Sequence, residues 1–138
     1  ERIAANRLNA SEASVVLIAH GSEKNEASFR AAVMQRDILS RLNIFKSIEV
    51  AFLEQSPRIS SVLQGVAKSD TDVICLGLFA SGGPHASEDI PAEIENWIEL
   101  QSEGAGHVFY EGAVGVRAEI VKLIQESVSR CAAQIKFS

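Results

Sequence analysis

Cysteine, proline and aromatic residues are scarce in this sequence of 138 residues. It has two cysteines, three prolines and only 6% aromatic residues. Cys75 lies within an apolar run and Cys131 within a late helical pattern, and neither belongs to a CxxC or zinc-type motif. We therefore expect two buried free thiols rather than a functional pair.

Long apolar runs and an excess of positive charge are also missing. No stretch approaches the roughly 20 consecutive apolar residues of a membrane span, and the N-terminus lacks the basic and apolar regions of a secretory signal. These features predict a cytoplasmic protein with no membrane partner. The net charge of −5 argues against nucleic acid as a partner, so an anionic ligand would need a local cluster of donors.

The overall composition is that of an ordinary globular domain. Hydrophobic residues make up 46% of the chain and charged residues 22%, which argues against a disordered or fibrous protein. A chain of this length is predicted to form one domain, residues 1–138. The polar residues 1–12 would be a frayed helix or an extension at its start.

Four apolar runs predict β-strands, and a segment with helical spacing follows each of them. The strands are expected at residues 14–19, 47–53, 72–79 and 107–112. The helices are expected at residues 25–42, 58–67, 89–101 and 117–135. For the third helix, Ser87 or Asp89 is available as the N-cap, and Pro91 falls in the first turn. This alternation predicts an α/β three-layer sandwich with a four-stranded parallel sheet covered on both faces.

The topology also predicts where a ligand would bind. In open parallel sheets, ligands bind beyond the C-terminal strand ends, where the strand order reverses. For the flavodoxin-like order 2-1-3-4, that crevice lies between strands 1 and 3, next to the loops at residues 19–26 and 80–91. Each loop holds a histidine, His20 and His85. Because adjacent strands lie about 4.8 Å apart, the two imidazoles could share one ion, and Glu54 at the end of strand 2 could point to the same place.

Each of these residues also has a purely structural interpretation. A histidine at a strand end can be a capping or core residue, and Glu54 can cap the second helix or pair with Arg58. Glu88 and Asp89 fall where the third helix is predicted to start, which favours capping and helix-dipole roles. His107 lies at the opposite, N-terminal end of strand 4 and is interpreted as structural or exposed.

Two histidines at one sheet edge suit a metal ion that has to be passed on. Neutral imidazole binds Co²⁺, Ni²⁺, Fe²⁺ and Zn²⁺, and it accepts protons near neutral pH. With only two or three protein ligands, the metal retains open positions, which favours transfer over storage. The glycine-rich phosphate loop, the dinucleotide fingerprint and the serine nucleophile elbow do not occur in these loops.

Three segments of the chain resemble, in order and spacing, the small sirohydrochlorin cobaltochelatases of the CbiX type. They read VVLIAHGS, VAFLEQSPRISSVL and LGLFASGGPHASEDIPAEI, and the likeness covers about residues 14–115. The paired motifs, HGS after strand 1 and GG-x-H-x-x-x-D-[IL]-P after strand 3, are far more specific than either histidine alone. The segment YEGAVGVRAEI matches the family only loosely.

The resemblance implies an ATP-independent class II metal chelatase, a lyase that inserts Co²⁺ into sirohydrochlorin in anaerobic cobalamin (vitamin B12) biosynthesis. It implies that His20 and His85 bind the incoming metal and assist deprotonation, and that Glu54, which matches a motif glutamate present in many members, is a further ligand. It also implies a homodimer and a tetrapyrrole substrate with multiple carboxylates. No tightly bound cofactor is expected, because the divalent metal is itself a substrate.

A flat macrocycle in the crevice would meet a turn without bulky side chains. Gly82, Gly83 and Pro84 would form a low wall beside it, although the two glycines could equally serve a tight turn with positive φ. Several donors near the crevice are candidates to hold the substrate carboxylates: Ser22, Lys24, Arg58, Arg117 and the backbone N–H groups that start the first, third and fourth helices.

Three other hypotheses about function stay open. The same mechanism could insert Fe²⁺ for siroheme or Ni²⁺ for a nickel tetrapyrrole, since the general order of first-row affinities does not select cobalt. The protein could instead carry a metal or a tetrapyrrole without catalysing insertion. It could also be a flavodoxin-like signalling or scaffold domain in which the two histidines are incidental.

Overall fold

The protein folds around a four-stranded parallel sheet with the strand order β2-β1-β3-β4, as predicted. A computed structural model describes residues 10–68, 71–79, 82–101, 106–116, 119, 125, 126 and 128–130. The strands are β1 (Ser14–Ala19), β2 (Ser47–Phe52), β3 (Val73–Gly77) and β4 (Val108–Ala113). The helical elements are η1 (Ala10–Glu12), α2 (Ala27–Ser40), α3 (Ile59–Val66), the π-helical turn η2 (His85–Asp89), α4 (Ile90–Glu99) and η3 (Val114–Val116).

The central position of β1 agrees with its sequence. All six residues of β1, SVVLIA, are buried, and Ser14 lies opposite both Ser47 of β2 and Val73 of β3. A strand with hydrogen-bonded neighbours on both sides and helices on both faces can be apolar throughout. The strand order therefore reverses between β1 and β3, which is where a ligand site is expected.

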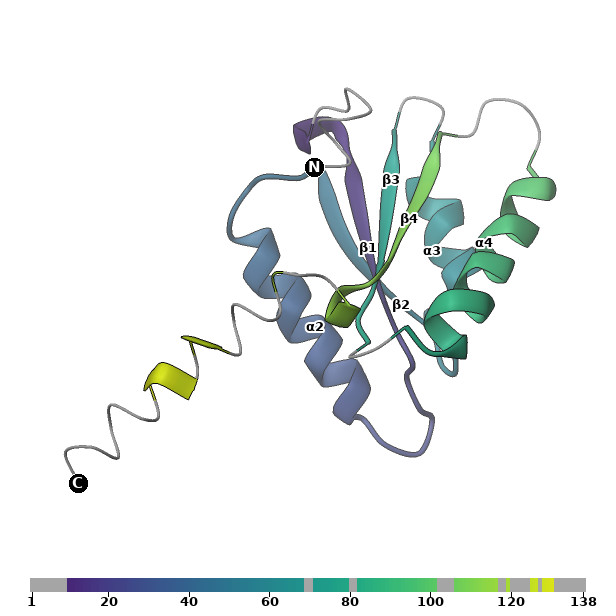
Figure 1. Cartoon of the computed structure of the whole chain (residues 1–138). Helices are drawn as coiled ribbons and strands as arrows, with labels where there is room; N and C mark the ends of the chain where they lie inside the picture. Colours follow the sequence, from purple (N-terminus) through teal and green to yellow (C-terminus); the bar gives the residue numbers. More distant parts are fainter. Residues whose placement is uncertain are drawn as a thin grey trace.

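Helices cover both faces of the sheet. α2 lies on one face, and α3 and α4 lie on the other (Figure 1). Successive side chains of a strand point to opposite faces, so Val15 and Leu17 belong to the core cluster beneath α2, whereas Val16 and Ile18 belong to the cluster beneath α3 and α4. This is the three-layer arrangement predicted from the alternation of strands and helices.

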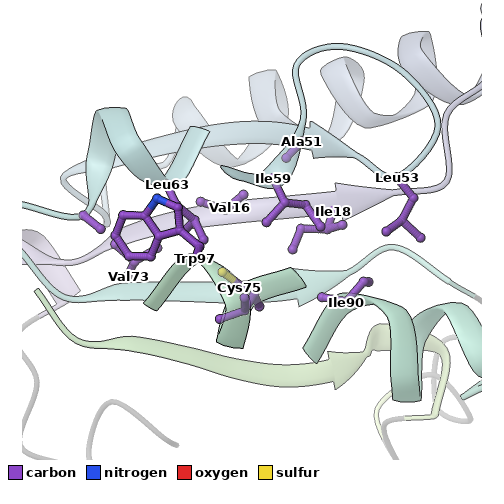
Figure 2. Packing of buried hydrophobic residues seen from close by; sticks show 12 residues of the cluster. Val16, Ile18, Ala51, Leu53, Ile59, Leu63, Val73, Cys75, Ile90 and Trp97 are labelled. Carbon is purple, nitrogen blue, oxygen red and sulfur yellow. The ribbon is translucent and has the colours of Figure 1, made fainter. Parts of the chain in front are cut away.

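The larger core cluster holds α4 against the sheet. Figure 2 shows the indole of Trp97 near Leu63 and Val73, with Ile90 toward the other end of the cluster. Leu63 and Ile90 have no exposed surface, and Trp97 is 5% exposed. Since Ile90 is the first residue of α4, its burial anchors the turn η2 that immediately precedes the helix.

Cys75 on β3 is a buried free thiol, as predicted. Its side chain belongs to the larger core cluster, and burial raises the pKa of the thiol to about 12. The thiol therefore stays protonated at neutral pH, which makes it a poor nucleophile and metal ligand. The second cysteine, Cys131, lies outside the described residues.

The described residues leave part of the α2 face open. A groove of about 700 Å³ lies beside α2 and the ends of β3 and β4. It is lined by Ala19, Ser28, Ala31, Ala32, Met34, Gln35, Leu78, Phe79, Val114 and Gly115. The fourth predicted helix, residues 117–135, falls for the most part outside the described residues. No helix in the described part of the chain has both the length and the apolar character needed to cross a bilayer.

Candidate metal centre

The loop after β1 is held by the loop after β2. The backbone N–H of Leu53 donates to the carbonyl of Ala19 at 3.1 Å, and that of Glu54 donates to the carbonyl of His20 at 2.8 Å. These two bonds extend the β1–β2 pairing beyond the strands. His20 therefore leaves the sheet from a fixed backbone position.

Gly21 makes the sharp turn that follows His20. Its φ is +75°, a region in which glycine alone is free of strain. The N–H of Gly21 donates to Oγ of Ser28 at 3.0 Å, and the N–H of Ser22 donates to Oε1 of Gln55 at 2.8 Å. Gly21 is buried, so the turn is packed on its inner side as well as hydrogen-bonded. The support from Gln55 was not anticipated from the sequence, because it depends on a contact between two loops.

His85 lies at the start of a helical segment rather than within a loop. The helix start predicted at residue 89 agrees to within one residue with α4, which begins at Ile90. The loop predicted at residues 80–91 is wrong from His85 onward, because the π-helical turn η2 runs from His85 to Asp89 and continues directly into α4. The N–H of Ile90 donates to the carbonyl of His85, a π-helical bond across five residues of the kind often found at functional sites.

Asp89, one of the two predicted N-caps, lies at the N-cap position of α4, but the predicted side-chain cap is not formed. Ser87 and Asp89 lie inside the continuous helical segment, and no side chain caps the start of α4. The segment begins instead at the carbonyl of Gly83, which accepts hydrogen bonds from the N–H groups of Ala86 and Ser87 and from Oγ of Ser87. The prediction for Pro91 is confirmed, since it falls in the first turn of α4.

The two predicted histidines meet at the C-terminal edge of the sheet. The ring centroids of His20 and His85 are 4.7 Å apart, and the rings meet edge to face at 70°. Both residues are exposed, so their rings can be reached by a ligand. This is the juxtaposition expected from the strand order.

The oxygen atoms next to the rings of His20 and His85 indicate which ring nitrogen carries the hydrogen. Nδ1 of His20 lies 2.8 Å from the carbonyl oxygen of Gly21, and Nδ1 of His85 lies 2.7 Å from Oδ2 of Asp89. Carbonyl and carboxylate oxygens only accept hydrogen bonds, so each neutral ring is assigned its hydrogen on Nδ1. Neither Nε2 has a hydrogen-bond partner among the described residues. Both Nε2 lone pairs are therefore available to a metal ion or a proton.

Asp89 makes a contact that was not predicted for it. It makes no capping hydrogen bond to the start of α4, and its carboxylate accepts from His85 instead. Glu88, the other predicted dipole partner, is an acidic residue in the first turn of η2. The four-residue spacing between His85 and Asp89 is the signal that would have identified this pair, if the helix had been predicted to begin at His85.

Tyr110 of β4 is a further residue that the sequence did not reveal. Its hydroxyl donates to the carbonyl of Ala86 at 2.7 Å, which fastens η2 to the sheet one residue after His85. Burial, and then the nearby Cys75, raise the pKa of Tyr110, so the hydroxyl keeps its proton to donate.

Glu54 follows β2 and its charge acts on Glu93 of α4. The pKa of Glu93 is raised, first by burial and then by the charges of Asp89 and Glu54, while Arg58 acts in the opposite direction. No group of three or more His, Cys, Asp or Glu side chains in the described residues is arranged to hold a metal ion. The structure therefore brings His20 and His85 together without Glu54, whose role as a ligand stays a prediction.

Two of the other residues predicted to bind substrate carboxylates, Arg58 and Ser22, make hydrogen bonds within the protein. Arg58 donates from Nη1 to the carbonyl of Leu53, so its guanidinium also supports the loop that holds Glu54. Oγ of Ser22 accepts from the N–H of Lys24 at 3.2 Å. Lys24 is exposed, and Arg117 lies outside the described residues.

The turn just before His85 carries little side-chain bulk, and the position of Gly82, Gly83 and Pro84 beside a macrocycle stays a prediction. Gly82 and Pro84 are exposed, and nothing lies within 4 Å of the position that a Cβ on Gly83 would occupy. Gly83 does not have a positive φ, so a tight left-handed turn is not its role. His107 is exposed at the opposite edge of the sheet, where its Nδ1 lies 3.3 Å from Oδ1 of Asp72.

The fold and the site define a parallel α/β domain with an exposed pair of imidazole rings where the strand order reverses. The chain belongs to the CbiX family, whose sequence model matches residues 14–131. It is 26% identical over 129 residues to a probable sirohydrochlorin cobaltochelatase of Halobacterium salinarum, covering 88% of this chain and 43% of that protein. The chain thus spans less than half the length of this curated relative.

Two solved structures share the fold. One is described as CbiX, the terminal enzyme for biosynthesis of siroheme in denitrifying bacteria, and it matches with a TM-score of 0.72 and 22% identity over 94% of this chain and 52% of its own. The other is a putative cobalamin biosynthesis CbiX protein from Marinobacter aquaeolei VT8, with a TM-score of 0.63 and 17% identity over 88% of this chain and 98% of its own.

Proposed function

We propose that this protein is an ATP-independent class II metal chelatase that inserts a divalent metal, with Co²⁺ as the first candidate, into sirohydrochlorin. The observation that carries the proposal is the pairing of His20 and His85, with ring centroids 4.7 Å apart and both Nδ1 atoms occupied by acceptors. Membership of the CbiX family supports the same reaction.

The chemistry of insertion matches what two imidazoles can do. A tetrapyrrole releases two pyrrole N–H protons when it takes up a divalent metal, so the site must hold a metal weakly and accept protons. Two nitrogen ligands leave open coordination positions into which the macrocycle nitrogens can enter. An imidazole that has released the metal can then accept a proton, because histidine titrates near neutral pH.

The charges around the pair favour the arrival of a cation. The charges of Asp89 and Glu54 both raise the pKa of Glu93, although less than its burial does, and Arg58 lowers it. An excess of negative charge at a cleft raises the local concentration of divalent ions. The carboxylates of the macrocycle would need donors away from this cluster, and the side chain of Lys24 and the turn at residues 82–84 are the candidates.

The choice of metal rests on the relatives. Cobalt is favoured by the name of the Halobacterium relative, whereas one structural neighbour is described as an enzyme of siroheme biosynthesis, which favours iron. Imidazole ligands do not by themselves select among these ions. We therefore propose cobalt insertion for cobalamin synthesis and keep Fe²⁺ or Ni²⁺ as alternatives to be tested in the same assay.

We also propose that two copies of the chain assemble as a homodimer that works in the cytoplasm. The homodimer is the assembly that the resemblance to the small CbiX chelatases implies. The buried free thiol of Cys75 is consistent with a reducing compartment. Light scattering coupled to gel filtration would test the dimer.

The first experiment is an anaerobic absorbance assay with sirohydrochlorin and Co²⁺, at protein concentrations far below that of the substrate. Wild type should accelerate insertion above the spontaneous rate over many turnovers. His20→Ala and His85→Ala should each lower the rate by about 100-fold or more, the usual range for lost acid–base groups. His107→Ala is the matched control, because it removes an exposed histidine from the opposite edge of the sheet.

The outcome separates the functional hypotheses. The chelatase hypothesis is supported if wild type and His107→Ala catalyse many turnovers whereas His20→Ala and His85→Ala do not. Metal or tetrapyrrole binding without turnover supports a carrier. If folded wild type does not accelerate insertion of Co²⁺, Fe²⁺ or Ni²⁺, the enzymatic proposal is wrong.

A further inference from the structure

The two histidines of the site are held by chemically different acceptors. Nδ1 of His20 donates to a neutral backbone carbonyl, that of Gly21, which is part of its own turn. Nδ1 of His85 donates to the charged carboxylate of Asp89 at 2.7 Å. Hydrogen bonds to an ionised acceptor are shorter and stronger than those to a neutral one. The proton position and ring orientation of His85 therefore depend on a single side chain that could be exchanged without altering the backbone.

We propose that Asp89 is a positioning residue that keeps His85 in the Nδ1–H tautomer and directs its Nε2 lone pair toward the metal shared with His20. Free neutral imidazole exchanges between its two tautomers, and only the Nδ1–H form leaves Nε2 able to bind a metal. A carboxylate on the remote nitrogen fixes that form and orients the ring. The proposal assumes the metal-binding role of His85 set out above, but its primary test does not require chelatase turnover.

The local structure argues against the simpler roles for Asp89. It does not cap α4, and Ser87 bonds back to the carbonyl of Gly83 rather than to the histidine. The side chains of His85 and Asp89 are 48% and 50% exposed, and exposed pairs of this kind contribute little to folding. Removing the carboxylate should therefore change the histidine while the domain stays folded.

The test compares Asp89→Ala and Asp89→Asn with wild type and with Glu88→Ala. Glu88→Ala is the matched control, because it removes an equal charge from an exposed position in the same turn. Long-range ¹H–¹⁵N correlation spectra of the histidine rings report the tautomer directly. The visible spectrum of Co²⁺, titrated into each variant without any tetrapyrrole, reports the affinity. Circular dichroism confirms folding.

We expect His85 of wild type and of Glu88→Ala to give the Nδ1–H pattern, and His85 of Asp89→Ala to give a mixture of tautomers. The Co²⁺ affinity should fall by about 10- to 100-fold in Asp89→Ala, with Asp89→Asn in between, because its amide oxygen can still accept the hydrogen bond. The signals of His20 should not change. If His85 keeps the wild-type tautomer pattern in Asp89→Ala, or if the Co²⁺ affinity of this variant equals that of Glu88→Ala, the proposal is overturned.

Both readouts remain informative if sirohydrochlorin is not the substrate. A tautomer change without any turnover in wild type would count against the proposed function and in favour of the role of Asp89. Turnover in wild type with an unchanged tautomer in Asp89→Ala would support the proposed function and count against the role of Asp89.

Discussion

Replacement of Gly21 by alanine should destabilise the domain and disturb His20 together. Gly21 has a φ of +75° and is followed by an N–H that donates to Gln55. A Cβ at this position would lie 2.7 Å from Cγ of Gln55 and 2.9 Å from Cβ of Phe52. Gln55 can move only by giving up its bond to Ser22, and Phe52 is completely buried at the end of β2.

The expected magnitude has two parts. A left-handed backbone conformation costs an L-residue about 1–2 kcal/mol relative to glycine. Insertion of a methyl group into a packed site costs about 1–3 kcal/mol. Their sum predicts that Gly21→Ala lowers the free energy of unfolding by roughly 2–5 kcal/mol, a large fraction of the stability of a small domain.

The variant Gly112→Ala separates the cost of the left-handed backbone from the cost of inserting a methyl group. Gly112 has a φ of +84° in β4, where the β3–β4 register shifts, but nothing lies within 4 Å of its Cβ position. It should therefore show the backbone cost alone. Urea unfolding, followed by the fluorescence of the single tryptophan, Trp97, measures both variants. Equal losses of stability in the two variants would refute the argument from the clash with Phe52 and Gln55.

Two further predictions concern the core. Leu63→Ala should lower the free energy of unfolding by about 2–5 kcal/mol, because Leu63 has no exposed surface. A loss below about 1 kcal/mol in a urea titration would contradict this and show that the larger core cluster closes around the cavity. Because the Cys75 thiol has a pKa of about 12 when folded and an ordinary value near 9, the unfolded chain releases this proton first as pH rises. Cys75 should therefore lower the free energy of unfolding between about pH 9 and pH 12, by about 1.4 kcal/mol per pH unit. Cys75→Ala should flatten this slope. If urea titrations across this range give the same slope for both proteins, the raised pKa of Cys75 is contradicted.

The fold could be predicted from the sequence because its signals are local and repeated. β1 is an uninterrupted apolar run, and such runs alternate with helical patterns, which is sufficient to predict a parallel sheet with helices on both faces. The positions of His20 and His85 at strand ends then predicted their meeting, since parallel strands bring their C-terminal ends to one edge. The start of α4 was predicted to within one residue, but the π-helical turn η2 before it was predicted as loop. Gly82, Gly83 and Pro84 indicated a turn, and the π-helical bond at His85 has no such local signal.

By itself, the sequence determined the class of fold, the edge of the sheet that carries the site and the two histidines that face each other there. These follow from residue type and period, which act over a few neighbouring positions. Only the tertiary structure decided that Asp89 bonds to His85 instead of capping a helix, that Tyr110 fastens the turn η2 to the sheet, and that Gln55 supports the turn after His20. Each of these depends on the distance and direction between side chains, which are settled when strands and helices pack, and not by the order of residues along one element.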